Sequence, residues 1–113
     1  MILTGETKED FERWLHSNDV LIKEGIYDAT YLTDVFEELP LNLRYALIIE
    51  WFDSVGIYIS INYVDFYDEL RNDTGFETYV TNKGLSVKFR SVSSRQEALT
   101  EAIKKANEIY NSK

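Results

Sequence analysis

The pattern of hydrophobic and polar positions changes its period in the middle of the chain. Over 40–54 the apolar residues recur at helical spacing, whereas over 57–63 they alternate with polar residues as in a strand. Pro40 suits the first turn of a helix, where a missing backbone N–H does no harm, and Gly56 separates the two patterns. The pattern therefore predicts a helix that leads directly into a strand. A strand over 45–52 is the competing interpretation, because Tyr, Ile, Trp and Phe all favour strands.

Two more stretches, 76–81 and 85–90, show the same alternation. The residues between them, 82–84, are Asn, Lys and Gly, which suit a short hairpin loop because Asn and Gly accept a positive φ. The polar stretch 65–75 is predicted to be a connection, since it ends in a turn-rich sequence. Together with the alternation over 57–63, these features predict three consecutive strands.

The C-terminal helix has the strongest signals. Ser94 and Glu97 form a capping box at its start. The apolar stripe that follows is unbroken and consists of Ala98, Leu99, Ala102, Ile103, Ala106, Ile109 and Tyr110. Near the N-terminus, Thr7 and Asp10 resemble a capping box, which predicts a first helix that starts at Thr7 and ends near residue 18.

Residues 19–39 have a weaker pattern. The stretch 20–22 is either a short strand or a packed loop, and helical spacing of the apolar residues predicts a second helix over 29–38. The fold class predicted is α+β, with a three-stranded antiparallel sheet packed against three or four helices in a single domain over 1–113.

The last helix is expected to pack on the first strand of the sheet. Its stripe of Leu99, Ile103 and Ala106 should meet the strand face that carries Ile57, Ile59 and Ile61.

Composition supports one folded domain. The chain has 113 residues, of which 44% are hydrophobic and 14% aromatic, and segments poor in aromatics are the ones that stay disordered. The absence of cysteine excludes disulfides, thiol catalysis and thiolate metal sites. The first ten residues lack the signal-peptide pattern, and no apolar run approaches the roughly 20 residues of a membrane span. A cytoplasmic protein without a membrane partner is expected.

Charge is placed unevenly along the chain. Residues 1–56 hold 12 acids and 4 bases, whereas residues 57–113 hold 8 of each, so the net charge of −8 comes from the first half. An acidic surface repels nucleic acid and attracts a basic protein. The alternative is that the charge serves only solubility. The candidate binding residues form an acidic and aromatic set: Glu9, Glu12, Tyr27, Tyr31, Asp34, Glu37 and Glu38.

Candidate chemistry is weak. His16 beside Ser17, and Glu50 with Asp53 on one helix face, lack a supporting motif and fit a solvated surface. The acidic stretch 65–73 lacks the spacing of a calcium loop, and the chain has no Gly-rich phosphate loop. We therefore expect no catalytic residue, metal site or cofactor.

Nucleic-acid binding is a further alternative. The second half of the chain is locally basic, and Tyr58 and Tyr79 could stack on bases. Its basic residues are Lys88, Arg90, Arg95, Lys104 and Lys105. The acidic first half opposes such binding, so no direct contact with nucleic acid is expected.

Three stretches resemble small uncharacterised proteins of bacteriophages and prophages. They are Phe11-Glu12-Arg13-Trp14, Leu39-Pro40 with Trp51 to Ile57, and Glu97-Ala98 with Glu101 to Ala106. The resemblance would cover most of the chain, and its motifs are structural rather than catalytic. It implies a virus-derived context, in which small acidic proteins sometimes inhibit host machinery, and it implies no known activity.

The function predicted is a non-enzymatic, acidic binding or regulatory module of phage type whose partner is a protein, in particular a basic one. The alternative is an acidic inhibitor or nucleic-acid mimic of a basic host protein. A small hydrolase or a metal-dependent enzyme is less favoured.

Overall fold

The computed structural model describes residues 1–18, 35–67, 72–91 and 94–112. Its elements, in chain order, are α1 (Gly5–Asn18), the 3₁₀ helix η1 (Phe36–Glu38), α4 (Leu41–Ser54), β1 (Ile57–Tyr67), β2 (Asn72–Asn82), β3 (Leu85–Ser91) and α5 (Arg95–Asn111). The stretch 20–22 and most of the predicted second helix lie outside the described residues. The three-stranded sheet and the α+β class are confirmed.

The sheet is antiparallel, with the strand order β1-β2-β3. The predicted hairpin is confirmed, but its loop is shorter than predicted, because Asn82 still pairs with Leu85. Lys83 and Gly84 form the loop and take positive φ, 52° and 80° respectively. The prediction for 65–75 was wrong, because β1 runs on to Tyr67 and β2 begins at Asn72, so most of this polar stretch pairs across the two strands. Continuous cross-strand pairing therefore overrides the turn-rich composition there.

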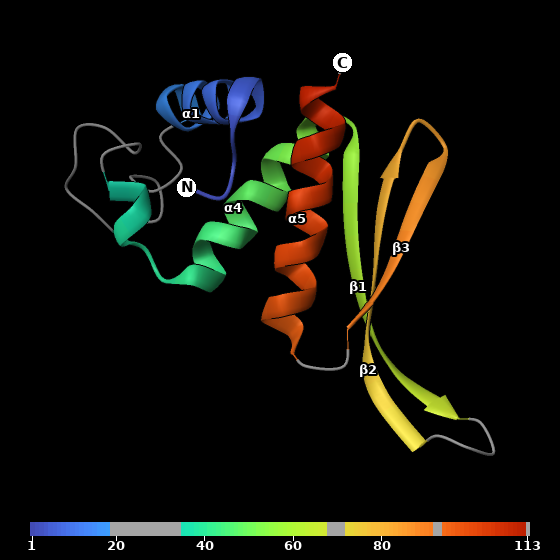
Figure 1. The fold of residues 1–113 in the computed structure, drawn as a ribbon. Helices are drawn as coiled ribbons and strands as arrows, with labels where there is room; N and C mark the ends of the chain where they lie inside the picture. Colours follow the sequence, from blue (N-terminus) through green and yellow to red (C-terminus); the bar gives the residue numbers. More distant parts are fainter. Residues whose placement is uncertain (19–34, 68–71, 92–93, 113) are drawn as a thin grey trace.

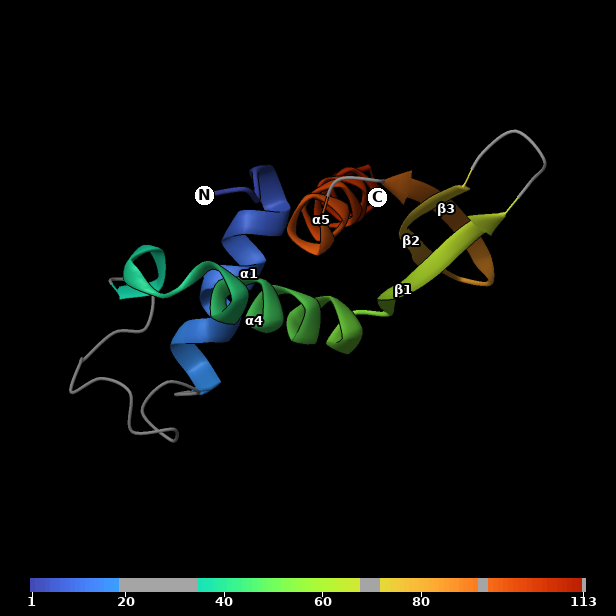
Figure 2. The same cartoon turned by 90° about the horizontal axis from the view of Figure 1, so that it is seen from below.

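All the described helices lie on one side of the sheet, as Figures 1 and 2 show. α5 packs against all three strands, and α4 packs against both β1 and α5. α4 passes into β1 through Val55 and Gly56, where Gly56 takes the positive φ of 85° that favours glycine. The predicted helix-to-strand transition is thus confirmed, and the strand alternative for 45–52 was wrong.

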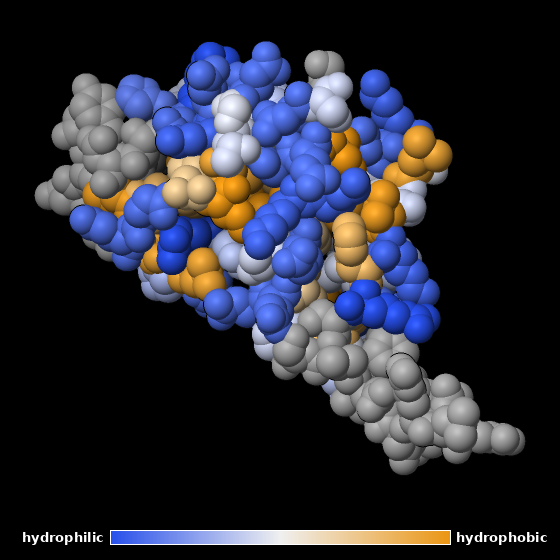
Figure 3. Space-filling view, in the orientation of Figure 1, coloured by the Kyte–Doolittle hydropathy of each residue, from blue (hydrophilic) through white to orange (hydrophobic). Residues whose placement is uncertain are grey.

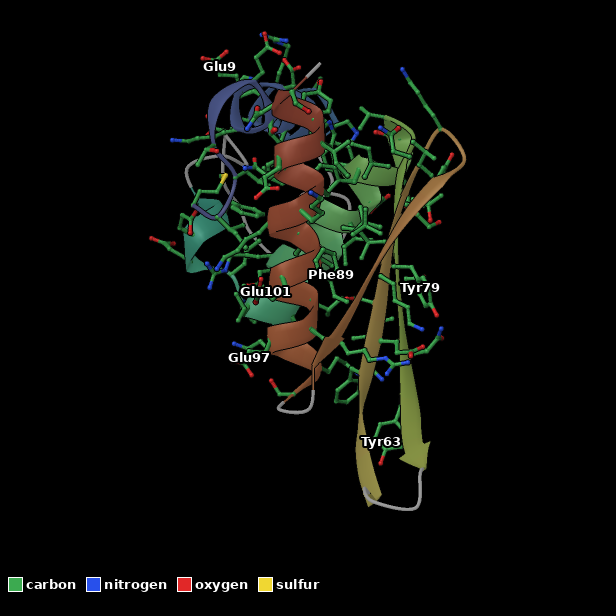
Figure 4. All side chains as sticks on the ribbon, turned by 45° about the vertical axis from the view of Figure 1, so that its right-hand side comes forward. Glu9, Tyr63, Tyr79, Phe89, Glu97 and Glu101 are labelled. Carbon is green, nitrogen blue, oxygen red and sulfur yellow. The ribbon has the colours of Figure 1, made fainter. Side chains whose placement is uncertain are left out.

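The core lies between α1, η1, α4, α5 and the sheet. Ile57 and Val80 are fully buried on the sheet face that meets Ile103 of α5, whereas Ile59 is only partly buried. Figure 4 shows Phe89 on the side of the sheet that faces α5 and Tyr79 on the opposite side. The hydrophilic residues of α5 cover its outward side in Figure 3, as an amphipathic helix requires.

The predicted start of α5 is confirmed. The Ser94 hydroxyl accepts a hydrogen bond of 3.1 Å from the backbone N–H of Glu97. Ile103 and Ala106 are fully buried, whereas Leu99 is only partly buried at the margin of the core.

The predicted start of α1 was wrong, because the helix begins at Gly5 and Thr7 is buried within it. The side chain that satisfies its first turn comes from α5: Asn111 Oδ1 accepts from the Thr7 backbone N–H at 3.0 Å and from the Thr7 hydroxyl at 2.8 Å. Asn111 Nδ2 donates to the Thr4 carbonyl at 2.9 Å. Gly5 has a φ of 60°, and a Cβ there would lie 3.0 Å from Asn111 Oδ1, so this close approach requires glycine.

Aromatic side chains fix the rest of α1. Phe11 is buried and lies edge-on to Trp51 of α4, with 5.8 Å between ring centroids, and Trp51 is edge-on to Tyr110 of α5 at 5.0 Å. The Tyr110 hydroxyl donates to the Asp10 carboxylate, and this hydrogen bond, with partial burial and the charge of Asp10, raises the pKa of Tyr110 to about 12. α1 and α5 are therefore joined at two places along their length.

The asparagine cap predicts a defined loss of stability. Asn111→Ala should lower the free energy of unfolding by about 1–2 kcal/mol, because the Thr7 N–H loses its acceptor and the Thr7 hydroxyl is left with the Asn107 carbonyl at 3.3 Å. Urea unfolding measures the change. Ser112→Ala is the matched control, since within the described residues the hydroxyl of this C-cap donates to the Ile109 carbonyl of α5 and does not contact α1, and it should change stability by less than about 0.5 kcal/mol. Equal losses for the two variants would contradict the cap.

The packing of α5 on the sheet predicts that alanine substitutions along α5 lower the free energy of unfolding by different amounts. Ile103→Ala should cost about 2–5 kcal/mol, because this fully buried side chain would leave a cavity. Leu99→Ala should cost less, because Leu99 is partly exposed at the margin of the core. Chemical denaturation of both variants checks the order, and a loss below about 0.5 kcal/mol for Ile103→Ala would refute the packing.

Candidate functional site

Two of the predicted acidic residues lie on α1. Glu9 is exposed, and Figure 4 places it at the end of the molecule that α1 forms. Glu12 is partly exposed, and its carboxylate lies 4.0 Å from the ammonium of Lys8. The i, i+3 spacing of Glu9 and Glu12 keeps them neighbours on the helix surface.

Two more predicted acidic residues, Glu37 and Glu38, lie in η1 and are exposed. The Glu37 carboxylate accepts from Arg44 at 3.1 Å and lies 3.8 Å from the terminal ammonium of Met1, so its charge is partly compensated. Arg44 also donates from Nε to the Leu39 carbonyl at 3.0 Å, which joins η1 to α4. The remaining predicted residues, Tyr27, Tyr31 and Asp34, lie outside the described residues.

Charge is separated between the parts of the fold. α1, η1 and α4 together carry eight acids and three bases, whereas α5 carries three of each. In Figure 1 these three acidic elements form the part of the molecule away from β2 and β3. We call them the acidic end.

The sheet face that points away from α5 forms a second polar surface. The strand register aligns its residues in three rows across β1, β2 and β3: Tyr58–Thr81–Ser86, Ser60–Tyr79–Lys88 and Asn62–Glu77–Arg90. No described helix covers this surface in Figure 2. We call these nine residues the outer sheet face.

Glu77 is the electrostatic centre of the outer sheet face. Its carboxylate accepts from Arg90 Nε at 3.1 Å, from the Tyr79 hydroxyl at 3.1 Å, and lies 3.2 Å from Lys88 Nζ. Partial burial acts to raise the pKa of Glu77. Hydrogen bonds from Lys88 and Tyr79 and the charges of Lys88 and Arg90 outweigh that effect and hold the pKa below its ordinary value of 4.5. Glu77 thereby holds both bases in place.

Sequence reasoning missed Glu77, although a signal was present. The hairpin loop after Asn82 fixes the register that sets Glu77 directly opposite Arg90 and diagonal to Lys88. Opposite charges at such positions stabilise a strand pair. The residue types could thus be read from the sequence, but the predicted loop over 82–84 is one residue longer than the observed loop of Lys83 and Gly84, so the pairing of Glu77 with Arg90 followed only from the observed register.

The other candidate chemistry gains no support from the geometry. The Ser17 hydroxyl donates to the Arg13 carbonyl at 2.7 Å, within its own helix, and His16 is exposed beside it. Asp53 is exposed near the end of α4, where partial desolvation raises the pKa of its carboxyl above 3.8. Within the described ranges, no three His, Asp or Glu side chains are placed to hold a metal ion.

A shallow groove of about 240 Å³ lies between α4 and α5. It is lined mainly by apolar atoms of Leu41, Tyr45 and Leu99, with Asn42, Arg95 and Gln96 completing its wall. The Tyr45 hydroxyl is hydrogen-bonded to the Thr100 hydroxyl at 2.7 Å. The groove therefore presents apolar surface and a single charged group.

None of the described helices combines the length and the apolar character that crossing a bilayer requires. Comparison of the chain with protein-family models, with curated proteins and with solved structures gives no match.

The Glu77 cluster predicts a dependence of stability on pH. A carboxyl whose pKa is lowered by folding stabilises the protein above its unfolded pKa of about 4.5, and that contribution disappears as the pH falls through the folded pKa. Glu77→Gln should therefore be less stable than the native protein near pH 7, and the difference should shrink near pH 3. Urea titrations at several pH values measure it, with the exposed Glu97→Gln as the control. A difference that does not change with pH would contradict the role of the Glu77 charge.

Proposed function

We propose that this protein is a non-enzymatic binding module that engages a basic protein through its acidic end. The observation that carries the proposal is the separation of charge: α1, η1 and α4 hold eight acids against three bases, and α5 is balanced. A concentrated field of one sign accelerates the encounter with a partner of the opposite sign.

The geometry of the acidic residues supports a recognition role. Glu9 and Glu38 make no ion pair within the described residues. The ammonium of Lys8 lies 4.0 Å from the Glu12 carboxylate, which is a long distance for an ion pair. Their carboxylates therefore remain accessible to cations of a partner. The proposal includes the phage context that the resemblance of the sequence implies, in which the partner is a host protein.

Inhibition of a nucleic-acid-binding host protein is the second candidate function. Acidic residues fixed on a rigid helix can occupy a site that otherwise holds phosphates, and Glu9 and Glu12 on α1 have such a support. Competition with duplex DNA for the captured partner distinguishes this inhibitor from a module that binds elsewhere.

The test uses two variants with the same total charge. Proteins captured from a bacterial extract on the immobilised protein are identified by mass spectrometry, and the basic protein recovered is purified. Its affinity is then measured for the triple variant Glu9→Lys, Glu12→Lys, Glu38→Lys and for the control Glu97→Lys, Glu101→Lys, Glu108→Lys on α5. All six side chains are at least partly exposed, so both variants should remain folded, which circular dichroism checks.

The Glu9, Glu12 and Glu38 variant should bind at least about tenfold more weakly, mainly because its association rate constant is lower. That rate constant should also no longer depend on salt concentration. The control should change affinity by less than about threefold, because its charges lie outside the acidic end. Equal losses in both variants would show that only total charge matters. Full affinity in the first variant would refute the acidic end as the binding site.

A further inference from the structure

The outer sheet face carries features that the acidic end does not explain. Tyr58 and Tyr79 lie diagonally on neighbouring strands, and Arg90 continues the diagonal onto β3. Tyr58 is 56% exposed, and the side chains of Lys88 and Arg90 are 44% and 60% exposed. Tyrosine and arginine are enriched at protein interfaces, where tyrosine gives rigid contact area at little cost in entropy.

Existing contacts hold these side chains in place. Glu77 bonds Arg90, Lys88 and the Tyr79 hydroxyl through one carboxylate, and Lys88 Nζ lies 6.0 Å from the centroid of the Tyr79 ring. A surface whose groups are already fixed loses less entropy when a partner binds.

The charge of this surface is opposite in sign to that of the whole protein. Lys88 and Arg90 outnumber Glu77, so the outer sheet face is +1 on a chain whose net charge is −8. A nucleic-acid strand carries a charge at every nucleotide and needs several cations, which this surface does not offer. One or two carboxylates of a peptide match its two bases, and arginine is suited to binding carboxylates.

We propose that the outer sheet face binds an acidic segment of a partner protein. Carboxylates of the segment contact Lys88 and Arg90, and an aromatic side chain of the segment packs on Tyr58 and Tyr79. This site is independent of the acidic end, which attracts partners of the opposite charge.

The probe is a random copolymer of glutamate and tyrosine, added to the full chain and followed by calorimetry and by backbone amide NMR shifts. Tyr58→Ala and Arg90→Gln should each weaken binding by about fivefold or more. Tyr63→Ala is the matched control for Tyr58, since Tyr63 lies on the same strand with 58% exposure but on the opposite face. Lys104→Gln on α5 is the control for the lost positive charge. Both controls should weaken binding by less than about twofold, and the shifts should concentrate on β1–β3.

Several results would overturn the proposal. The proposal fails if the copolymer does not bind, or if polyglutamate binds as tightly as the copolymer. It also fails if the control variants lose as much affinity as Tyr58→Ala and Arg90→Gln. A fourth contrary result is that a 20-nucleotide oligothymidylate binds more tightly than the copolymer and that Tyr58→Ala and Arg90→Gln weaken this binding. The last result would identify the surface as a single-strand nucleic-acid site instead. The variant with Glu9, Glu12 and Glu38 changed to Lys should bind the copolymer at least as well as the native protein, which separates this proposal from the proposed function.

Discussion

The contacts of Trp51 hold the helices together. This side chain is only 2% exposed. The centroid of its ring lies 5.8 Å from the ring centroid of Phe11 in α1, and 5.0 Å from those of Phe52 in α4 and Tyr110 in α5. α1 contacts α4 and α5, and this aromatic cluster, the asparagine cap from Asn111 and the Tyr110–Asp10 hydrogen bond all contribute to its attachment. Each aromatic pair contributes about 0.5–1.5 kcal/mol beyond the apolar area it buries. The orientation of α1, and with it the direction of its acidic residues, therefore depends on the contact of Phe11 with Trp51 and on the two hydrogen-bonded sites shared with α5.

α5 separates the two polar surfaces of the molecule. One side of it packs on the sheet through Ile103, and it also contacts α1 and α4. Because α5 has equal numbers of acids and bases, it adds no net charge between the acidic end and the outer sheet face. The net negative charge of the acidic end and the net positive charge of the outer sheet face therefore lie on different elements, on either side of a helix without net charge.

The sequence predicted the elements whose signals are local. The capping box at Ser94 and the change of period at Gly56 depend on neighbouring residues, and both appear where expected. The start of α1 could not be predicted, because its cap comes from Asn111, 104 positions beyond Thr7. The continuation of β1 was missed because strand pairing outweighed polar composition. Of the candidate site, Glu9, Glu12, Glu37 and Glu38 were proposed from charge alone and lie at least partly exposed, whereas the Glu77 cluster became visible only with the register.

The asparagine cap also bears on when the protein can finish folding. During synthesis the N-terminal helix leaves the ribosome first, but its cap belongs to residue 111 and does not yet exist. Helices of 14 residues are marginal in isolation, so α1 has little stability until α5 has formed and docked. The length-dependent part of the chain entropy lost on closing a segment of 104 residues is about 4 kcal/mol. The chain loses this entropy when α5 docks on α1. Until the last turn of α5 has docked, Trp51 lacks its contact with Tyr110, and exposed hydrophobic surface of this kind makes a folding intermediate prone to aggregation and dependent on chaperones.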